Sequence, residues 1–472
     1  MTLAPAPADW LLEKSQQIPR GVALTGEQTL SYEELESQTS RLAAGLTTQG
    51  VRHGQIVAVQ LESAEQLARL FYGTLYLGAT LLPLDPALER GRRDRLLATV
   101  GAHCLIARSP SSATGVAWID PATPLVKAGD GVAACTPRPL AGDGIQLIIA
   151  TSGTTGEPKG VQLSAANLAA SVVSSGQRLE LHGDDCWLAC LPLFHIGGLS
   201  ILLRCLAAGA RVQLEEGFDP ERIWRQIVQG GVTHISLVPA MLDRLLRQSA
   251  GQTPPATLRV VLIGGGPLST TLAQWAHDAG WPLCVSYGLS ETASQFATDC
   301  SPRAGLVAGR VGLPLTGYEV AIGAAGRIRV RGPAVMRGYA NVAGVLGQGL
   351  TQGWFETGDL GRLDEQGRLT VIGRVDDLLV SGGKNVHPAE VEERLMQCPG
   401  VVEVGVAGRP DPVWGVILVA LFNGEVTVEQ LTRWSQQLPG HLRPRQFIRT
   451  GKLPRNRMGK LNRPALLALL DQ

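Results

Sequence analysis

The chain of 472 residues is long for a single hydrophobic core, and its length favours about three domains. Its 42 lysines and arginines balance 41 aspartates and glutamates, so its net charge of +1 is too small to attract nucleic acid or an acidic membrane surface. Hydrophobic residues make up 44% and charged residues 18% of the chain, which is typical of a compact globular protein and argues against disorder.

The cysteines and the apolar stretches suggest a reduced protein outside the membrane. None of the eight cysteines belongs to a CxxC pair, so we expect eight free thiols, a cytoplasmic location and no zinc site. Residues 1–19 lack a basic segment followed by an apolar run, and no stretch reaches the roughly 18 apolar residues of a membrane span. We therefore expect no signal peptide, no membrane span and no nucleic-acid partner.

Helical and strand-like patterns alternate along the first 140 residues. Ser31 is a suitable N-cap for a helix over residues 32–50, and a second helix is predicted over residues 64–78. Short apolar runs at 55–60 and 80–84 predict strands. This alternation predicts an α/β sheet with helices on its faces.

Further strands are predicted at 146–150, 234–238 and 259–263, and each is followed by Gly, Pro, Ser or Thr. In open α/β sheets, ligands collect at such strand ends. Later the pattern changes. In residues 326–330 and 368–372, apolar and polar residues alternate, which is typical of antiparallel strands. The last hundred residues predict a small α+β domain with a helix at 388–396 and strands at 401–406 and 416–422.

The strongest local signal follows directly after the strand at 146–150. Hydroxyl residues, three glycines and a lysine gather within ten residues, in the sequence TSGTTGEPKG. Glycine-rich backbone N–H groups, hydroxyls and a lysine are the donors that bind a polyphosphate. The segment therefore predicts a phosphate-binding loop formed by Thr151, Ser152, Gly153, Thr154, Thr155, Gly156 and Lys159. It is not a Walker A loop, because Gly-Lys-Ser/Thr does not occur in the chain.

This loop closely resembles that of the adenylate-forming superfamily, which includes acyl- and aryl-CoA ligases, peptide-synthetase adenylation domains and luciferases. Other motifs of the superfamily follow in the same order, and the resemblance covers nearly the whole chain. They are Pro192 to His195, Gly264 to Gly266, Tyr287 to Thr292, Thr357 to Asp359, Gly373 to Asp377, Ser381 to Gly383, and Gly459 with Lys460. Two positions depart from the pattern, since Ser290 replaces the usual threonine and Ala165 a frequent histidine.

The resemblance implies an α/β fold with a large N-terminal adenylate-forming domain, which includes a small β-barrel-like subdomain, and a small mobile α+β C-terminal domain. We expect the N-terminal domain at 1–373, a hinge at 374–376 and the C-terminal domain at 377–472. Members of the superfamily turn a carboxylate and ATP into an acyl-adenylate and pyrophosphate, and a thiol then displaces AMP. The implied cofactors are ATP, Mg²⁺ and CoA, and fixed positive groups should dominate catalysis because both steps move negative charge.

The resemblance also assigns roles to individual residues. The catalytic residues would be Lys460, His195 and Glu291, and Glu291 with Thr151 would hold Mg²⁺. Besides the phosphate-binding loop, ATP and AMP would be bound by Gly264, Gly265, Gly266, Ser286, Tyr287, Gly288, Ser290, Asp359 and Arg374. Asp376 would be the hinge, and the loop of Ser381, Gly382 and Gly383 would face CoA.

The sequence gives less information about the acid substrate than about the nucleotide site. The acyl pocket would be formed by His195, Leu199, Ser236, Gly288, Leu289 and Ser294. The segments around these residues most resemble o-succinylbenzoate–CoA ligases of menaquinone synthesis, and residues 373–388 are close to benzoate-type ligases, so an aromatic acid is favoured. A dicarboxylate would need a second cation in the pocket, and the sequence does not identify that residue.

Other classes of protein have to be distinguished from an aryl-CoA ligase. A stand-alone adenylation enzyme that loads a carrier protein, or a medium-chain acyl-CoA synthetase, would share the ATP residues. A non-catalytic binding module would have lost Lys460, Asp359 or Glu291, and a serine hydrolase would need a GxSxG motif, which is absent. The expected partners are a small carboxylic acid, ATP and CoA, in a monomer or homodimer.

Overall fold

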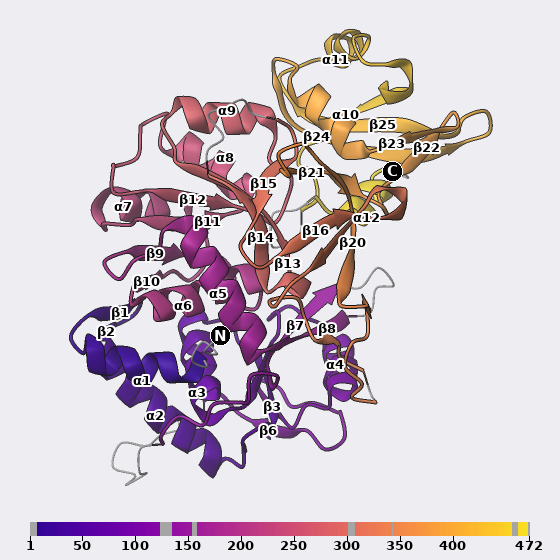
Figure 1. Ribbon diagram of the computed structural model, residues 1–472. Coiled ribbons are helices and arrows are strands. Elements are labelled where there is room, and N and C mark those ends of the chain that lie inside the picture. The colour runs from indigo at the N-terminus through magenta and orange to yellow at the C-terminus, as the bar shows by residue number, and fades with distance from the viewer. Residues whose placement is uncertain are drawn as a thin grey trace.

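A large α/β body and a smaller C-terminal lobe make up the computed structural model, which describes residues 7–122, 135–152, 158–300, 307–341, 343–455 and 461–470 (Figure 1). Its helices are α1 (Pro7–Gln17), α2 (Tyr32–Thr48), α3 (Ala64–Leu77), α4 (Arg90–Val100), α5 (Ala165–Leu179), α6 (Ile196–Ala208), α7 (Pro220–Gln229), α8 (Pro239–Gln248), α9 (Thr270–Asp278), α10 (Pro388–Met396), α11 (Val428–Ser435) and α12 (Arg463–Ala468). No helix in these ranges is both long and apolar enough to cross a membrane.

One sheet of the large body carries the segment that leads into the predicted phosphate-binding loop. Its strands lie in the order β18 (Gly338–Tyr339), β8 (Pro158–Ser164), β7 (Ile145–Ser152), β4 (Thr80–Pro83), β3 (Ile56–Gln60), β5 (Cys104–Ala107) and β6 (Ala117–Ile119). The pairs from β7 to β6 are parallel, whereas β7 and β8 form an antiparallel hairpin.

A second, longer sheet carries most of the other predicted site residues. Its strands follow the order β16 (Glu319–Ile322), β17 (Arg327–Arg331), β20 (Trp354–Leu363), β21 (Leu369–Arg374), β15 (Arg310–Pro314), β14 (Ser294–Asp299), β13 (Leu283–Leu289), β12 (Val260–Ile263), β11 (His234–Leu237), β9 (Cys186–Ala189), β10 (Arg211–Leu214), β1 (Val22–Thr25) and β2 (Thr29–Ser31), with β19 (Leu350–Thr351) beside β20. The predicted small β-subdomain is therefore continuous with the large sheet through β15, which pairs with both β14 and β21.

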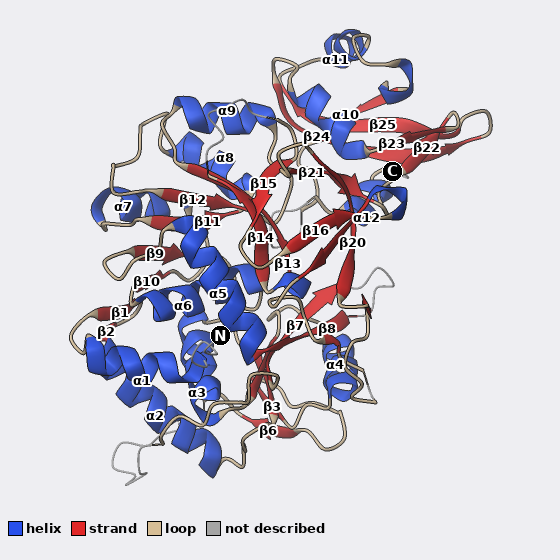
Figure 2. Cartoon of the chain, viewed as in Figure 1, coloured by secondary structure: helices blue, strands red, loops and turns tan. Residues whose placement is uncertain are grey.

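Helix α5 joins the two sheets of the large body. It packs against β14 of the long sheet and against β7 and β8 of the other, so it lies between them (Figure 2). The C-terminal lobe has its own sheet of β24 (Val401–Asp411), β25 (Gly415–Gly424) and β26 (Gln446–Arg449), with the short pair β22 (Leu379–Ser381) and β23 (Lys384–Val386) beside it.

The elements predicted from hydrophobic patterning are confirmed, with ends that differ from the observed ones by at most five residues. Ser31 caps α2 through a capping box with Glu34. The predicted start of this helix depended on Ser31 as its N-cap. The predicted helix at residues 388–396 coincides with α10, and the runs at 234–238 and 259–263 form β11 and β12. The expected antiparallel strands form β17 and β21, and those of the lobe form β24 and β25.

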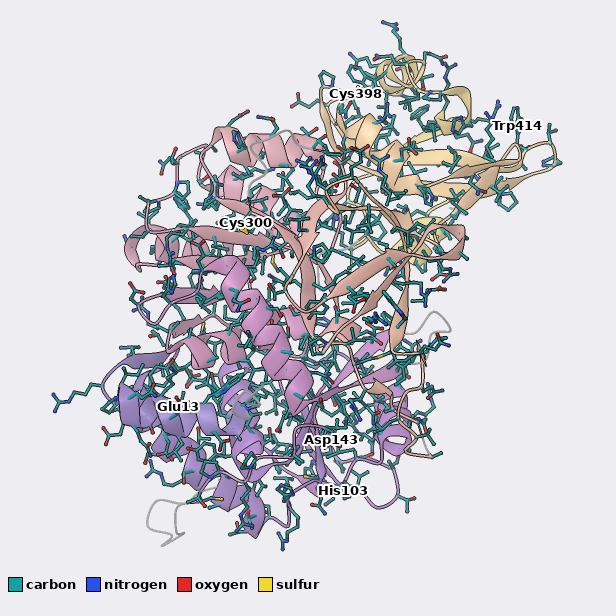
Figure 3. All side chains as sticks on the ribbon, in the orientation of Figure 1. Glu13, His103, Asp143, Cys300, Cys398 and Trp414 are labelled. Carbon is teal, nitrogen blue, oxygen red and sulfur yellow. A yellow bond between two sulfur atoms is a disulfide. The ribbon has the colours of Figure 1, made fainter. Side chains whose placement is uncertain are left out.

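The expectation of eight free thiols is wrong. Cys284 and Cys300 form a disulfide, while the other six cysteines are free. The two residues lie 16 positions apart in the chain, but the antiparallel register of β13 and β14 pairs Val285 with Asp299 and so brings them face to face. Cys300 lies at the exposed end of β14 (Figure 3). Sequence spacing alone does not reveal this cross-strand neighbourhood.

Few hydrogen bonds join the lobe to the large body. Among the described residues, those between residues 7–373 and 377–470 run from the backbone N–H and the hydroxyl of Thr270 to the carboxylate of Glu393, at 2.8 Å for the backbone donor. Thr270 is the first residue of α9, where backbone N–H groups have no partner inside the helix. The carboxylate of the lobe therefore satisfies donors at the start of a helix of the large body.

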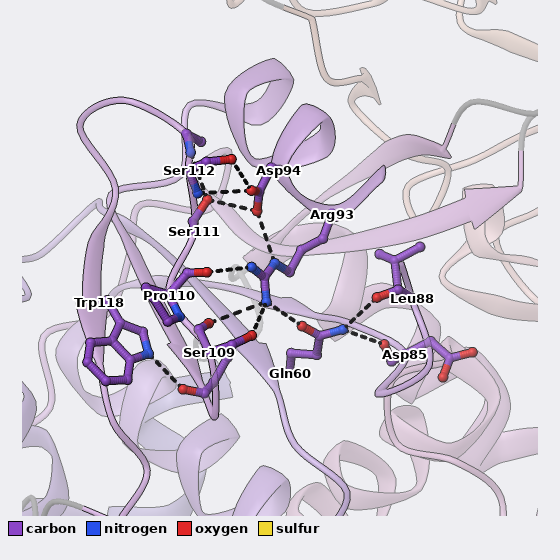
Figure 4. Close-up of polar contacts among 12 residues, drawn as sticks. Gln60, Asp85, Leu88, Arg93, Asp94, Ser109, Pro110, Ser111, Ser112 and Trp118 are labelled. Carbon is purple, nitrogen blue, oxygen red and sulfur yellow. Dashed lines mark hydrogen bonds and ion pairs between the residues drawn. The ribbon is translucent and has the colours of Figure 1, made fainter. Parts of the chain in front are cut away.

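A buried arginine joins α4 to the end of β3. Arg93 is 1% exposed and donates hydrogen bonds to Asp94, to the side chain of Gln60 and to the carbonyls of Ser109 and Pro110 (Figure 4). Burial raises the pKa of Asp94, but hydrogen bonds from two neighbouring serines and from Arg93 outweigh it and lower that pKa. Every charged group of this cluster is thus paired, as a structural role requires.

We predict that Arg93→Ala lowers the free energy of unfolding by about 3 kcal/mol, because it leaves a buried carboxylate with one partner fewer. Urea unfolding followed by tryptophan fluorescence would measure this change. Arg92→Ala is the matched control, because Arg92 is exposed on the same helix and should change stability by less than about 0.5 kcal/mol. Equal effects of the two variants would contradict the structural role of Arg93.

Candidate active site

Three predicted nucleotide-binding residues meet where β13, β20 and β21 come together. The hydroxyl of Tyr287 donates a hydrogen bond of 2.6 Å to the buried carboxylate of Asp359, and an Nη1–Oδ1 distance of 3.5 Å separates Arg374 from the same carboxylate. Burial raises the pKa of the Tyr287 phenol well above its usual value, and the charge of Asp359 adds to this effect. Tyr287 therefore remains a protonated donor to Asp359.

The glycines after β12 leave room beside this cluster. Gly265 has a φ of +75°, a conformation that residues with a Cβ rarely adopt. A Cβ on Gly264 would lie 3.0 Å from the hydroxyl oxygen of Ser286, which itself donates to the carbonyl of Ile263. A flat ring can approach the backbone here because side-chain atoms are absent.

A second cluster surrounds Glu291, just after β13. The hydroxyl of Tyr339 donates to Glu291 Oε1 at 2.7 Å, and the Nζ of Lys159 lies 5.2 Å from the centre of the Tyr339 ring. Ser290 and Glu291 begin a short 3₁₀ turn. The contact thus brings a predicted metal ligand close to the lysine at the end of the phosphate-binding segment. Tyr339 was not predicted as a site residue.

The β7–β8 hairpin presents the two ends of the predicted phosphate-binding loop. Thr151 pairs with Lys159 across the ladder, and its hydroxyl lies 3.4 Å from the carbonyl of Lys159. The loop itself, with Gly153, Thr154, Thr155 and Gly156, lies outside the described residues, as does the side chain of Ser152. The predicted catalytic Lys460 also lies outside them.

The residues predicted to form the acyl pocket lie at the start of α6, on β11 and on the β13–β14 hairpin, and the β11 residue is the buried Ser236. His195 is the half-buried N-cap residue of α6, and Leu199 is buried one turn further along. Gly288 is opposite Gln295, and a Cβ at Gly288 would lie 2.2 Å from the carbonyl oxygen of Ser294, so only glycine fits there. Leu289 and Ser294 are paired across the same hairpin and therefore face one side of it.

The backbone at the turn of this hairpin is strained. Ala293 has a φ of +52° and Ser294 a φ of +116°, both unusual for residues other than glycine. The hydroxyl of Ser171 donates to the carbonyl of Ala293 at 2.7 Å, and that of Thr292 donates to the carbonyl of Ser294 at 2.7 Å. Strain held in place in this way is typical of ligand sites.

The sequence analysis did not single out Arg204, which contacts a residue predicted for the acyl pocket. It lies on α6 with 2% exposure, and its Nη2 donates to the Ser294 hydroxyl at 2.9 Å. In the described parts of the chain no carboxylate forms an ion pair with it, and its Nε has no hydrogen-bond partner. Burial lowers the pKa of the guanidinium to about 10, which leaves it charged at neutral pH. The sequence contained one signal for this residue, because it is the single arginine inside the apolar run ILLRCLAA.

The predicted hinge lies next to the nucleotide cluster. Arg374 contacts Asp359 on one side and Asp376 on the other, where the Nη2–Oδ2 distance is 3.3 Å. Gly382 and Gly383 have φ values of +57° and +74°. A Cβ on Gly382 would lie 2.6 Å from the ring of Trp414, so the loop beginning at buried Ser381 packs directly on that indole.

Two family comparisons agree with this geometry. Residues 11–340 match the AMP-binding enzyme family, and residues 390–460 match the AMP-binding enzyme C-terminal domain. The 2-succinylbenzoate–CoA ligase of Bacillus cereus (strain Q1) is 34% identical over 477 residues, which cover 98% of this chain and 99% of the relative.

Solved structures of the o-succinylbenzoate CoA synthetase from Bacillus subtilis are also similar, at 33% identity. Its complex with the acyl-adenylate intermediate OSB-AMP has a TM-score of 0.88 and covers 97% of both chains. Its complex with ATP and magnesium ion has a TM-score of 0.86 and covers 97% of this chain and 99% of that chain. A double mutant bound to the product analogue OSB-NCoA has a TM-score of 0.73, with coverage of 97% and 98%.

The predicted α/β fold and the resemblance to adenylate-forming enzymes are therefore confirmed. The chain belongs to the AMP-binding enzyme family, and it is an acid–thiol ligase related to the 2-succinylbenzoate–CoA ligases.

Proposed function

We propose that the protein is an ATP-dependent ligase that joins 2-succinylbenzoate to CoA, with a step in menaquinone synthesis as its biological role. The acid first attacks the α-phosphate of ATP to give an acyl-adenylate and pyrophosphate. The thiol of CoA then forms the thioester and releases AMP. The observation that carries the choice of acid is the buried, charged Arg204 beside the acyl pocket, together with the names of the relatives.

Arg204 supports a dicarboxylate substrate because no carboxylate among the described residues pairs with it. A buried cation without a paired anion is strongly unfavourable. 2-Succinylbenzoate carries two carboxylates, of which one reacts and the other remains charged. A remaining carboxylate close to Arg204 and Ser294 would supply the missing anion, and this is the second cation that the sequence alone does not identify.

The nucleotide site would use the two clusters around β13. Asp359 would accept the ribose hydroxyls while Tyr287 and Arg374 hold it in place. The backbone of Gly264 to Gly266 would lie against the adenine, and the β7–β8 hairpin with Lys159 would bind the phosphates. Ser286, Gly288 and Ser290 would complete the surface beside them.

The residues near Glu291 fit a magnesium ion held with the help of substrate phosphates. In the described residues no three His, Cys, Asp or Glu side chains gather as a preformed metal site. Mg²⁺ commonly uses one or two carboxylates and completes its shell with phosphates and water. Glu291 and Thr151 would be its ligands from the protein, and the ion would neutralise charge on the phosphates.

Lys460 and His195 would act on the two half-reactions. During adenylation, the ammonium of Lys460 would stabilise the negative charge where the substrate carboxylate attacks the α-phosphate. His195 would separate the acyl group from the path of the thiol. A cavity of about 390 Å³ supports such a path, because it is lined by Leu191 to Phe194 directly before His195.

Free CoA is favoured as the thiol over a carrier protein. The cavity beside Phe194 shares Leu61, Glu62 and Pro86 with a second cavity of about 210 Å³, which is lined by Arg90 and Arg108. The larger cavity is also lined by Glu62, Glu215 and Glu216, so the two arginines of the second cavity are the groups that suit the phosphates of CoA. Such a ligase would act in the cytoplasm, where ATP and CoA are available.

On the C-terminal lobe, the guanidinium of Arg445 lies 3.8 Å from the centre of the Trp414 ring, against which the Gly382 loop packs. Trp414 lies at the tip of the β24–β25 hairpin and is 41% exposed (Figure 3). An exposed aromatic ring beside an arginine would suit the nucleotide end of CoA.

The lobe at 377–472 would rotate about the hinge at 374–376 relative to the domain at 1–373. The chain fits the Bacillus subtilis enzyme better in its OSB-AMP complex, with a TM-score of 0.88, than in its product-analogue complex, with 0.73. This difference supports two arrangements of the same two domains. Lys460 would enter the site in one of them, and the loop of Ser381, Gly382 and Gly383 in the other.

For the substrate, we predict a kcat/KM for 2-succinylbenzoate about 100-fold or more above that for benzoates and C6–C10 fatty acids, because only the dicarboxylate satisfies Arg204. The measurement is CoA-thioester formation over this panel, with a carrier protein offered in place of CoA as a second arm. Arg204→Met, which keeps the length of the side chain but removes the charge, should lose most of the preference. A higher kcat/KM for any fatty acid, or transfer to the carrier protein alone, would refute the assignment.

For Lys460, we predict that Lys460→Ala slows adenylation on the order of 100-fold or more, because one charge-assisted contact to the α-phosphate is lost. Pyrophosphate release would measure this step. Thioester formation from supplied acyl-adenylate should stay close to the wild-type rate. An equal loss in both half-reactions would mean that Lys460 has another role.

For the hinge, we predict that Asp376→Pro keeps adenylation but loses most thioester formation from acyl-adenylate. Proline fixes φ near −65° and so prevents the backbone change that a hinge needs. Both half-reactions would be measured, with Asp376→Ala as the control for the loss of the carboxylate that contacts Arg374. Wild-type thioester formation by the proline variant would rule out rotation at this residue.

A further inference from the structure

Trp187 lies at the centre of the polar contacts that support the proposed acyl pocket. It belongs to β9 and has no exposed surface. Its indole Nε1 donates to the hydroxyl of Ser236 at 3.2 Å, and the guanidinium of Arg204 lies 5.4 Å from the ring centroid. One buried side chain therefore contacts two polar residues of the pocket from two different elements, β11 and α6.

The aromatic neighbour of Trp187, His234, carries no charge that would compete with Arg204. Its ring packs against His234 with 5.1 Å between the ring centroids. Both ring nitrogens of His234 are bonded, to the hydroxyl of Thr233 at 2.8 Å and to the carbonyl of Leu179 at 3.2 Å. Burial lowers the pKa of His234, so this imidazole stays neutral at ordinary pH. The face of the indole can therefore attract the guanidinium without competition from a protonated His234.

An aromatic face stabilises a buried cation in a particular way. The electron-rich face of the ring attracts the cation, and this attraction is stronger when the contact is shielded from water. Unlike a carboxylate, it does not cancel the charge and does not occupy the N–H donors at the edge of the guanidinium. For Arg204 the Nη2 donates to Ser294 while the Nε has no partner in the described chain. A carboxylate of the substrate can still bind these donors in the plane of the guanidinium.

We propose that Trp187 is a positioning residue that sets the specificity of this enzyme for an acid with a second carboxylate. It holds the guanidinium of Arg204 charged and oriented, and it fixes the hydroxyl of Ser236 on the same side of the pocket. The proposal rests on the proposed function and adds a residue that contacts neither substrate nor nucleotide.

The test compares two acids in the same sample of enzyme. One is 2-succinylbenzoate, and the other is 4-oxo-4-phenylbutanoate, which lacks the carboxylate of the ring. The readout is the ratio of their kcat/KM values for CoA-thioester formation. This ratio is independent of the concentration of active enzyme, so a variant that folds only in part still reports specificity.

We expect Trp187→Leu, which removes the aromatic face and the N–H donor, to lower this ratio about tenfold or more, since a desolvated cation–π contact is lost. The loss should appear mainly in KM for 2-succinylbenzoate, while kcat/KM for 4-oxo-4-phenylbutanoate stays within a few-fold. Trp187→Phe keeps a ring face and should retain most of the ratio. Arg204→Met gives the ratio expected when the cation is absent.

The outcomes separate this proposal from the proposed function. A wild-type enzyme without preference for 2-succinylbenzoate would overturn the proposed substrate, and with it this role of Trp187. A wild-type enzyme with the preference, together with an unchanged ratio in Trp187→Leu, would overturn only the role of Trp187. Equal losses in Trp187→Leu and Trp187→Phe would overturn the role assigned to the ring face.

Discussion

The site depends on the close approach of two strands at Gly288. A Cβ there would lie 2.2 Å from the carbonyl oxygen of Ser294 and 2.4 Å from the Cα of Gln295, so any other residue would push β13 and β14 apart. The same hairpin carries Tyr287 on the nucleotide side and Ser294 on the acyl side. One steric constraint therefore fixes the distance between the residues proposed for the two halves of the acyl-adenylate.

Buried charges in this protein fall into two kinds. Arg93 and Asp94 satisfy each other and their neighbours within the fold, so they need no ligand. Arg204 is as deeply buried, yet among the described residues it has a hydroxyl and an aromatic ring in place of an acid. An unpaired buried charge is energetically unfavourable. A buried charge such as that of Arg204 therefore indicates a place where a ligand supplies the opposite charge. This difference, rather than burial alone, is the reason for the proposed role of Arg204.

The sequence predicted the strands and the motifs between them, because hydrophobic runs and glycine-rich turns are local signals. Ser31 and α10 are examples in which the cap and the boundaries follow from neighbouring residues alone. The sequence did not predict Arg204, whose meaning depends on Ser294, 90 positions away, nor the Cys284–Cys300 pair, which depends on the register of a hairpin. The roles of Lys460 and the phosphate-binding loop remain predictions, because these residues lie outside the described chain.

The proposed hinge and the proposed ribose site share Arg374. Its guanidinium lies 3.5 Å from Asp359 and 3.3 Å from Asp376, so a ribose bound to Asp359 would compete with one of the two contacts that orient it. The lobe is otherwise joined to the large body, among the described residues, by the hydrogen bonds from Thr270 to Glu393. A hydrogen bond to a charged group contributes about 1.5–3 kcal/mol. Contacts of this size can break during a catalytic cycle, so occupancy of the ribose site can influence which arrangement of the lobe is favoured.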